Sequence, residues 1–267
     1  MNIIVPIKQV PETSNVKMDP VTGTMIREGV QSIINPLDLY AIEAAIQFRE
    51  RHGGKVTVIS MGPPNAEKAL REAIAMGCDD AVLITDRAFA GADTWSTSYV
   101  LAKAIGKLGS FDLIICGERA TDGDTGQVGP NIASALDVPL ATYVSGIDSM
   151  EPEKKEMTVW RMTEYGYELL LLPLPALLTV VKEISFPRLP TLRGKQRARQ
   201  TQIPVYNAGN LDVEADKIGL KGSPTRVIKI ETPKVTRGGI LIKPSDEQSL
   251  DAAIDQLVDF LKAKDII

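Results

Sequence analysis

The sequence predicts an α/β protein with a mostly parallel sheet flanked by helices, a Rossmann-like nucleotide-binding architecture. Two short apolar runs, Val56–Ser60 and Leu113–Cys116, have the length and composition of strands buried on both faces. Between such runs lie longer segments with apolar residues every three or four positions, as in 37–48. The alternation of the two patterns as far as Val181 is typical of parallel strands joined by helical crossovers.

Each element follows from its local pattern. Asn35 is expected to cap a helix with Pro36 at its first position, and Asn65 a helix that ends at Met76. Proline, glycine and alternating polarity over Glu12–Glu28 predict a loop or hairpin. The remaining helices are expected over Ala92–Leu108 and from Val128 to Leu136. The other strands are expected over Asn2–Val10, Ala81–Ile84, Val138–Ile147, Thr158–Met162 and Ala176–Val181, the last closing the sheet.

The character of the chain changes at Phe186, so we expect a nucleotide-binding domain over 1–185 and an extended arm over 186–267. From Phe186 to Gly222 no long period survives, and four positive charges stand in the seven positions 193–199. Such a run usually forms a solvated loop, although it can also steer an acidic partner. A last helix is predicted from Ser245, with an apolar stripe that packs either on its own sheet or on another chain.

Composition excludes several classes of function. The chain has 267 residues, a net charge of −4 and a pI of about 5.3, which argues against nucleic acid or an anionic membrane as partner. Its two cysteines form no CxxC motif, and its one histidine, His52, lies in a polar turn, so metal and Ser-His-Asp chemistry are not expected. No leader precedes Ile3, and prolines interrupt the longest apolar run, so we expect a cytoplasmic protein without membrane insertion.

The stretch Cys116–Pro139 is the most informative. It joins a buried strand to a helix through a loop that holds Gly117, Asp122, Gly123, Asp124 and Gly126. The first N–H groups of a helix lack internal partners and favour an anion, so Thr125–Val128 could hold a phosphate. The same residues would also suit a tight solvated turn, because neither GxGxxG nor a P-loop is present.

Several motifs in order resemble the electron-transfer flavoprotein β subunit. They are the loop Gly117–Val128 followed by a helix and Pro139, the opening Ile7–Pro11, Asn35-Pro36-Leu37-Asp38, and Met61-Gly62-Pro63. The match covers nearly the whole chain. Independently of it, Pro6–Lys8, Met61–Pro63 and Gly117–Gln127 all fall at or near the ends of predicted strands, where α/β sheets bind ligands.

The resemblance implies an adenine-containing cofactor. Asn35, Asp38 and Met61 would line its adenosine end, Asp122 would shape the loop or accept a ribose hydroxyl, and Thr125–Val128 would hold phosphate. No catalytic acid or base is expected, because the flavin carries the chemistry. The residues expected to bind the cofactor are Pro6, Lys8, Asn35, Asp38, Met61, Gly62, Gly117, Ala120, Asp122, Thr125, Gly126, Gln127 and Val128.

Members of the family hold either AMP or a second FAD at this site. The run Asp122–Gly129 and the opening Val10–Thr13 are more similar to electron-bifurcating members, which hold FAD and take hydride from NADH. Such members pass one electron to ferredoxin or flavodoxin and the other to the FAD of the α subunit. The AMP-binding alternative stays open, since AMP is part of FAD.

The resemblance also implies partners. The stretch after Phe186 is similar to the family's recognition loop, so Pro187, Arg188, Leu192, Arg197 and Arg199 are expected to bind a dehydrogenase of acyl-CoA or lactate type, with Leu192 as apolar anchor. The C-terminal arm would reach the α subunit. The alternative from another class is a free-standing sensor of adenine nucleotides, which would need neither the basic stretch nor the arm.

Overall fold

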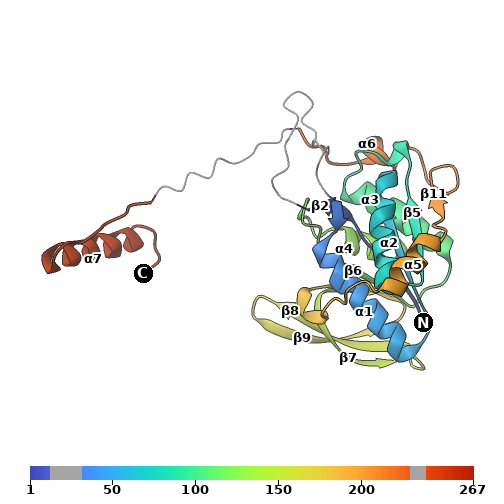
Figure 1. The fold of residues 1–267 in the computed structure, drawn as a ribbon, viewed down its shortest axis with the longest axis horizontal. Helices are drawn as coiled ribbons and strands as arrows, with labels where there is room; N and C mark the ends of the chain where they lie inside the picture. The colour runs from blue at the N-terminus through green and yellow to red at the C-terminus, as the bar shows by residue number, and fades with distance from the viewer. Residues whose placement is uncertain (13–31, 229–238) are drawn as a thin grey trace. The chain divides into compact units, whose positions relative to one another are not determined.

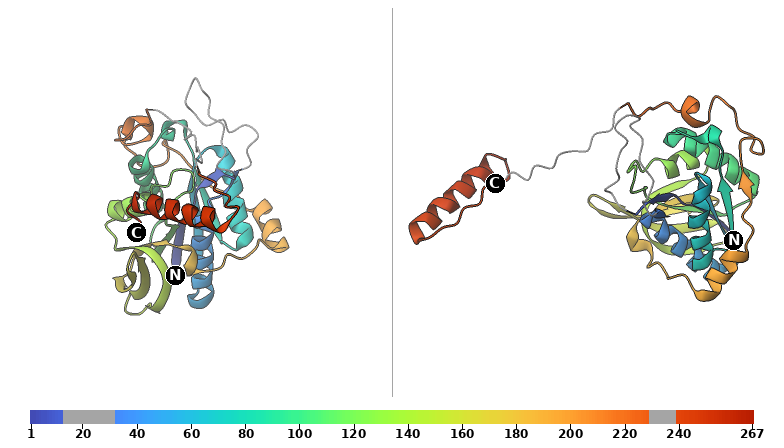
Figure 2. Two further views of the ribbon diagram at one scale, coloured as in Figure 1. Left: turned by 90° about the vertical axis from the view of Figure 1, so that its left-hand side faces the viewer. Right: turned by 45° about the horizontal axis from the view of Figure 1, so that its top comes forward.

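The computed structural model describes residues 1–12, 32–228 and 239–267 (Figure 1). The chain divides into two compact units, Met1–Ile228 and Lys229–Ile267, which are described separately. Figure 2 gives two further views of both. The first unit therefore continues past residue 186, and the segment 186–228 packs with the sheet.

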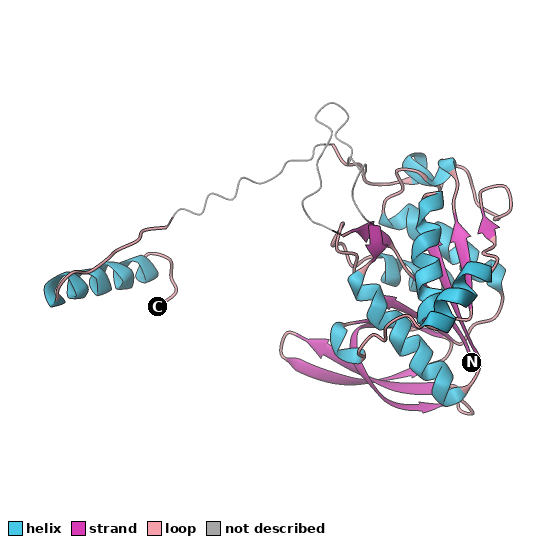
Figure 3. Ribbon diagram, in the orientation of Figure 1, coloured by secondary structure: helices cyan, strands magenta, loops and turns pink. Residues whose placement is uncertain are grey.

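The predicted α/β class is confirmed by a nine-stranded, mostly parallel sheet in the order β11-β5-β4-β1-β6-β10-β7-β8-β9 (Figure 3). Six parallel strands form one part of the sheet, and the three strands of the meander described below form the rest. The parallel strands are β1 (Asn2–Pro6), β4 (Lys55–Met61), β5 (Asp80–Ile84), β6 (Leu113–Gly117), β10 (Ala176–Val180) and β11 (Val205–Tyr206).

The chain reverses its direction across the sheet at β1. From β1 it moves outward to β4 and β5, and then returns to place β6 on the other side of β1. The carboxyl ends of β1 and β6 therefore lie at the reversal of strand order, the place where open α/β sheets bind ligands.

Two buried apolar clusters hold helices against the two faces of the sheet. One contains residues of α1 (Pro36–His52), α2 (Glu67–Met76) and α5 (Leu192–Gln200). The other contains residues of α3 (Thr94–Leu108) and α4 (Val128–Leu136). The parallel strands thus carry apolar side chains on both faces, as their uninterrupted apolar sequences predict.

An antiparallel meander extends the sheet beyond β10. It consists of β7 (Leu140–Glu151), β8 (Glu156–Thr163) and β9 (Gly166–Pro173), with β7 parallel to β10. The expectation that Ala176–Val181 closes the sheet is wrong, because β10 lies inside it and β9 forms the edge. In the sequence the apolar residues of β9 and β10 follow one another closely, so the turn between the two strands was not predicted.

Several predicted boundaries are also wrong. Asn65 does not cap α2, because a short 3-10 turn, η1 (Pro64–Ala66), comes first and Ala66 holds the cap position. α3 begins at Thr94 rather than at residue 92, since the Asp93 carboxylate accepts the Ser96 N–H and fixes the start. The first strand ends at Pro6, and Gln9–Pro11 (β2) instead pairs with Ser32–Ile34 (β3). Most of the expected loop at 12–28 lies outside the described residues.

The basic stretch is a helix where the sequence indicated a loop. In α5 the Thr191 hydroxyl accepts the Gly194 N–H at the N-cap, and Ala198 is buried against α2. Only one residue of α5 is buried, so no apolar period marks it in the sequence. The smaller remaining elements of this unit are η2 (Arg87–Phe89), η3 (Lys182–Ile184) and α6 (Gly219–Gly222).

The second unit contains α7 (Glu247–Lys262). Asp246, not Ser245, is its N-cap: the Asp246 carboxylate accepts the Ser249 N–H, and the Ser249 hydroxyl accepts the Asp246 N–H. The predicted apolar stripe is present, and Leu250, Ile254 and Leu257 are about half exposed in this unit. Within the described residues, none of the helices has the length and apolar character needed to cross a membrane.

Candidate functional site

The candidate nucleotide site lies beyond β1 and β6, where the chain changes direction. Pro6 ends β1, Met61 ends β4, and Gly117 ends β6. These strands are neighbours in the sheet, so the three segments predicted to line the site meet at one edge. Gly62 continues from Met61, and its N–H donates to the Ile84 carbonyl at 3.0 Å.

Asn35 holds the loop that follows β6. Its side-chain amide donates to the Arg119 carbonyl at 2.9 Å, and its side-chain oxygen accepts the Thr121 N–H at 3.1 Å. The side chain is fully buried and makes no cap to α1. Asn35 thus occupies the N-cap position of α1 but uses its side chain to position the loop on either side of Ala120, another predicted site residue.

Asp38 joins α1 to the ends of two strands. Its carboxylate accepts the Lys8 N–H at 2.7 Å and a second bond from the Gly117 N–H. Gly117 lies so close that an added Cβ would stand 2.5 Å from the Asp38 carboxylate. Burial raises the pKa of Asp38 to about 7, against the lowering effect of these hydrogen bonds. Asp38 is thus a buried connector under the site.

The loop itself is shaped by two residues in the left-handed region, Asp124 at φ 53° and Gly126 at φ 64°. Two ion pairs fasten it: Lys8 Nζ lies 2.7 Å from Asp122, and Arg119 Nε lies 3.0 Å from Asp124. The Asp124 N–H closes a turn onto the Ala120 carbonyl at 2.8 Å. The two aspartates are therefore structural residues of the loop, as expected for turn-forming side chains.

The backbone donors of Thr125, Gly126, Gln127 and Val128 stand at the N-terminus of α4. No described residue accepts a hydrogen bond from any of these four N–H groups. Residues 121–125 are exposed, so the site is open on this chain. An array of unpaired N–H groups at the positive end of a helix is suited to a phosphate.

Three further residues position this helix and were not predicted. Gly129 packs on β10, where an added Cβ would lie 2.5 Å from the Thr179 side chain. The Thr94 hydroxyl donates to the Gln127 side-chain oxygen at 2.8 Å, and Arg119 pairs with Asp124 as described above. The sequence carries no local signal for contacts between α3 and α4, although a glycine in a helix facing a sheet does suggest close approach.

A cavity of about 540 Å³ lies away from this edge, between α3, α4 and the loop near Asn210. Its two lysines are already engaged within the chain, Lys103 with Asp212 and Lys107 with the Asn210 carbonyl. In the described part of the chain, no group of three or more His, Cys, Asp or Glu side chains is arranged to hold a metal ion. The strand-end loop is therefore the better candidate site.

Comparison with known proteins identifies the family of the chain. The model of the electron transfer flavoprotein domain matches residues 22–211. Electron transfer flavoprotein subunit beta of Thermoanaerobacterium thermosaccharolyticum is 49% identical over the full length of both chains. The Megasphaera elsdenii protein of the same name is 44% identical, again over both full lengths. The chain belongs to the electron transfer flavoprotein family.

A third relative carries a more specific name. The caffeyl-CoA reductase-Etf complex subunit CarD of Acetobacterium woodii is 45% identical over the full length of both chains. The relatives named as β subunits match from end to end, so the family assignment extends to the role of β subunit and to the α-subunit partner that this role implies.

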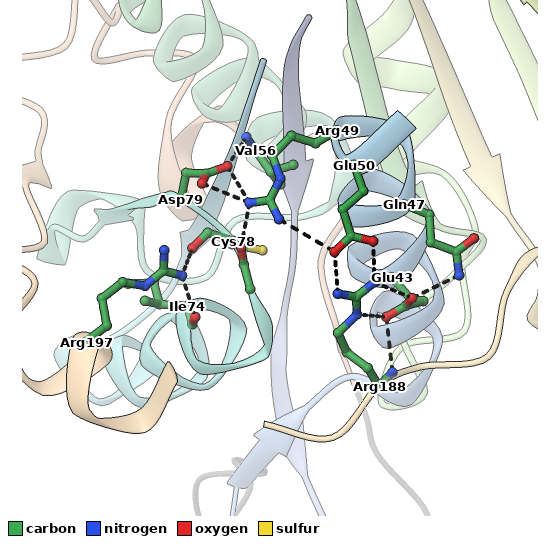
Figure 4. A network of polar contacts seen from close by, with 11 residues as sticks. Glu43, Gln47, Arg49, Glu50, Val56, Ile74, Cys78, Asp79, Arg188 and Arg197 are labelled. Atoms are coloured by element: carbon green, nitrogen blue, oxygen red, sulfur yellow. Dashed lines mark hydrogen bonds and ion pairs between the residues drawn. The ribbon is translucent and has the colours of Figure 1, made fainter. Parts of the chain in front are cut away.

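In this electron transfer flavoprotein chain, the segment predicted to bind a dehydrogenase is fastened to α1 and α2 (Figure 4). Arg188 contacts two glutamates of α1: its Nε lies 2.8 Å from Glu43, and its Nη1 lies 2.6 Å from Glu50. These hydrogen bonds raise the pKa of Arg188 and lower those of both glutamates. Arg197 donates to the Ile74 and Cys78 carbonyls at the end of α2.

The rest of this segment faces outward. Leu192 is 86% exposed at the start of α5, and Phe186 and Leu189 are similarly exposed. Arg199 is also exposed, whereas Pro187 is half-buried. Among the predicted partner-binding residues, Arg188 and Arg197 fix the segment to the domain, and Leu192, Arg197 and Arg199 are exposed.

Proposed function

We propose that this chain is the β subunit of an electron-bifurcating electron transfer flavoprotein, with FAD at the loop between β6 and α4. NADH would deliver two electrons as hydride, one destined for ferredoxin or flavodoxin and the other for the FAD of the α subunit. From there the second electron would reach a partner dehydrogenase. This proposal goes beyond the β-subunit role, which the family comparison already supports.

The observation that carries the proposal is the set of four N–H groups at the start of α4. They lie at the start of the helix that follows β6, next to the reversal of strand order, where open α/β sheets bind ligands. Their positive electrostatic potential suits one or more phosphates, and an adenosine would lie over the neighbouring ends of β1 and β4.

The residues present fit such a cofactor. Thr125–Val128 would hold phosphate, and Asp122, already 2.7 Å from Lys8 Nζ, would face the ribose. Met61 and the Pro6 carbonyl would line the adenine. Asn35 holds the loop by its bond to the Arg119 carbonyl, and Asp38 holds the segment after β1 by its bond from the Lys8 N–H. When bound, the flavin supplies one- and two-electron redox chemistry that no side chain of the site offers.

FAD is preferred over AMP on two grounds. The loop Asp122–Gly129 resembles that of bifurcating members, and a full-length relative is named as a subunit of a caffeyl-CoA reductase-Etf complex. AMP alone would satisfy the same phosphate donors, so the two cofactors differ only in what extends beyond the phosphate.

The exposed side chains of 186–200 are proposed to dock the dehydrogenase. Leu192 supplies an apolar anchor, and the surrounding Arg193, Lys195 and Arg199 supply positive charge in an acidic protein. The stripe of α7, exposed within its own unit, is proposed to pack on the α subunit.

The test is the nucleotide content of the chain co-expressed with its α subunit, measured by chromatography after denaturation. Two FAD per heterodimer and no AMP would support the proposal. One FAD and one AMP would replace it with the non-bifurcating alternative, in which this chain is a scaffold and partner reader. A chain that carries AMP and binds no α subunit would instead be a sensor module.

A further inference from the structure

The first turns of α3 are polar on their buried side, whereas the rest of the helix is apolar there. Ser96 and Ser98 are 0% and 1% exposed. Further along the helix the buried residues, such as Val100 and Ile105, are apolar. A buried hydroxyl costs free energy unless it is hydrogen-bonded, and a fully bonded polar cluster fixes one arrangement of its neighbours. The start of α3 is therefore suited to hold neighbouring segments in position.

One of these neighbours is the nucleotide loop. The Thr94 hydroxyl donates to the Gln127 side-chain oxygen at 2.8 Å. The Ser98 hydroxyl lies 2.6 Å from the Thr94 carbonyl oxygen and 3.2 Å from the Val128 carbonyl oxygen. Gln127 and Val128 supply two of the four N–H groups that we propose to hold phosphate. The position of these donors therefore depends on the first turns of α3.

The other neighbour is segment 217–225, which precedes the C-terminal arm and is called the arm root below. The Asp93 carboxylate, which caps α3 through the Ser96 N–H, also accepts the Thr225 N–H at 3.0 Å and the Thr225 hydroxyl at 2.8 Å. The Asp93 N–H donates to the Ser223 hydroxyl at 2.8 Å. Burial works against the charge of Asp93, but the bonds from Ser96 and Thr225 outweigh it and hold the pKa of this carboxyl below its ordinary value.

The arm root lies closely against the start of α3, and its short helix α6 packs beside α3 (Figure 1). The Ser96 hydroxyl donates to the Lys217 carbonyl at 3.1 Å. Gly219 has φ 58°, and an added Cβ would stand 2.1 Å from the Ala88 carbonyl oxygen. The first compact unit ends at Ile228, so the arm root is close to its end. The first turns of α3 thus contact both the nucleotide loop and the arm root.

We propose that Asp93 and Thr94 are positioning residues of the nucleotide site, and that they couple its affinity to the seating of the arm root. The proposal rests on the proposed function, because it takes the loop between β6 and α4 as the nucleotide site. Thr94 acts through Gln127, and Asp93 acts by fixing the turn that carries Thr94. When the arm root is displaced, Asp93 loses both hydrogen bonds from Thr225, and this turn loses part of its support.

Such a coupling is reciprocal. A seated arm root that favours the nucleotide-binding form of the loop must itself be favoured by bound nucleotide, by the same factor. A purely structural role for the same contacts has a different consequence. Loss of the Thr94 or Thr225 hydroxyl would then lower the stability of the domain and leave the nucleotide affinity of the folded protein unchanged.

The experiment uses the full chain co-expressed with a tagged α subunit, stripped of nucleotide and titrated separately with AMP and with FAD. Thr94→Val removes the hydroxyl at nearly unchanged volume, and Thr94→Ser keeps it. Gln127→Met removes the same hydrogen bond from the other side, and Thr225→Val removes only the hydroxyl bond to Asp93. Thr57→Val is the matched control, the same change near the start of β4 and away from the strand ends that line the site. Thermal unfolding of each nucleotide-free complex reports the fold.

Thr94→Val and Gln127→Met are each expected to weaken binding of the nucleotide about threefold to tenfold, the contribution of one hydrogen bond. Thr94→Ser and Thr57→Val should bind as the wild type does. Thr225→Val should weaken binding about threefold. The Thr94→Val/Thr225→Val double variant should bind no more weakly than Thr94→Val alone, because the arm root acts on the loop through Thr94.

Unchanged affinity in folded Thr94→Val and Gln127→Met proteins would overturn the proposal and leave the nucleotide site in place. Equal losses in Thr94→Val and Thr94→Ser would also overturn it, since the hydroxyl would then have no part in binding. Unchanged affinity in Thr225→Val, or losses that multiply in the double variant, would overturn the coupling to the arm root. A wild-type complex that binds neither AMP nor FAD would overturn the proposed function itself.

Discussion

Arg71 of α2 and Arg197 of α5 each bind the end of the other's helix. Arg71 donates to the Ala198 and Thr201 carbonyls at the end of α5, and Arg197 donates to the Ile74 and Cys78 carbonyls near the end of α2. Cations at helix C-termini satisfy orphan carbonyls and oppose the negative end of the dipole. The two helices therefore cap one another, which fixes the basic segment on the domain.

This relationship predicts that the two arginines are energetically coupled. Arg71→Ala or Arg197→Ala should each lower the free energy of unfolding by about 1–3 kcal/mol, the range for hydrogen bonds from charged groups. The loss in free energy of unfolding in the double variant should be about 1 kcal/mol smaller than the sum of the two single losses. Removing one arginine already loosens the contact between α2 and α5, so the other arginine has less left to stabilise. Urea unfolding of the four proteins measures this. Arg199→Ala, exposed on the same helix, should change little, and strict additivity would show that the caps are independent.

A second prediction concerns the pairing of Arg188 with α1. The Glu43 side chain is 4% exposed and accepts from the Arg188 backbone and guanidinium, whereas that of Glu50 is 48% exposed. Glu43→Gln weakens charge-assisted hydrogen bonds at a buried position, so it should destabilise the chain by about 1–3 kcal/mol, and Glu50→Gln at the surface by under 1 kcal/mol. Arg188→Lys should not restore the stability, since an ammonium lacks the fork that reaches both carboxylates. Equal effects of Glu43→Gln and Glu50→Gln, again measured by urea unfolding, would contradict this assignment.

A third prediction separates docking from stability. Leu192 is 86% exposed, so Leu192→Ala should leave the free energy of unfolding within about 0.5 kcal/mol of the wild type. The same change should raise the KM for the partner dehydrogenase about tenfold if Leu192 fills a pocket there. Val227→Ala, at a side chain that is 78% exposed elsewhere in the unit, is the matched control. An unchanged KM would remove Leu192 from the docking surface.

The sequence sufficed for the sheet because its parallel strands are short apolar runs between amphipathic helices. It failed for α5, whose stability comes from Thr191, Arg71 and Arg197 rather than from an apolar stripe. Gly194 shows the same limit: an added Cβ would lie 2.1 Å from the Ala75 carbonyl, a contact that only the folded chain reveals.

The position of the candidate site could be predicted from the sequence, but the roles of its individual residues could not. Motif and spacing correctly placed the loop between β6 and α4, at the edge of the sheet where the carboxyl ends of the parallel strands meet. They gave no indication that Asn35 holds the loop through Arg119 and Thr121, or that Asp38 is buried. These roles depend on contacts between residues 30 to 86 positions apart, for which the local sequence has no pattern.

A fourth prediction follows from the pKa of Asp38, which burial raises to about 7 from 3.8. Between these two pH values the folded chain holds a proton that the unfolded chain has lost. The folded state binds more protons there, so the free energy of unfolding falls as pH rises from about 4 to about 7. The fall contributed by Asp38 is on the order of a few kcal/mol, since one unit corresponds to about 1.4 kcal/mol.

Urea unfolding of the wild type and Asp38→Asn across this range tests the prediction. The difference in stability, wild type minus variant, should decrease with rising pH, because asparagine does not titrate. Parallel profiles would mean that the Lys8 and Gly117 N–H groups keep the carboxylate ionised despite its burial.

The last prediction addresses the phosphate loop directly. Gly126 has φ 64°, where a residue with a side chain pays about 1–2 kcal/mol and a β-branched residue more. Gly126→Val should move the Thr125–Val128 donors and empty the nucleotide site, while the apolar clusters keep the domain folded. The matched control is Gly123→Ala in the same exposed loop, because its added Cβ would meet no atom within 4 Å. Nucleotide recovered per chain after denaturation measures occupancy, and circular dichroism reports the fold. Full occupancy in a folded Gly126→Val protein would exclude this loop as the phosphate site. Loss of nucleotide from both variants would show that any change in the loop empties the site, whatever the backbone conformation at Gly126.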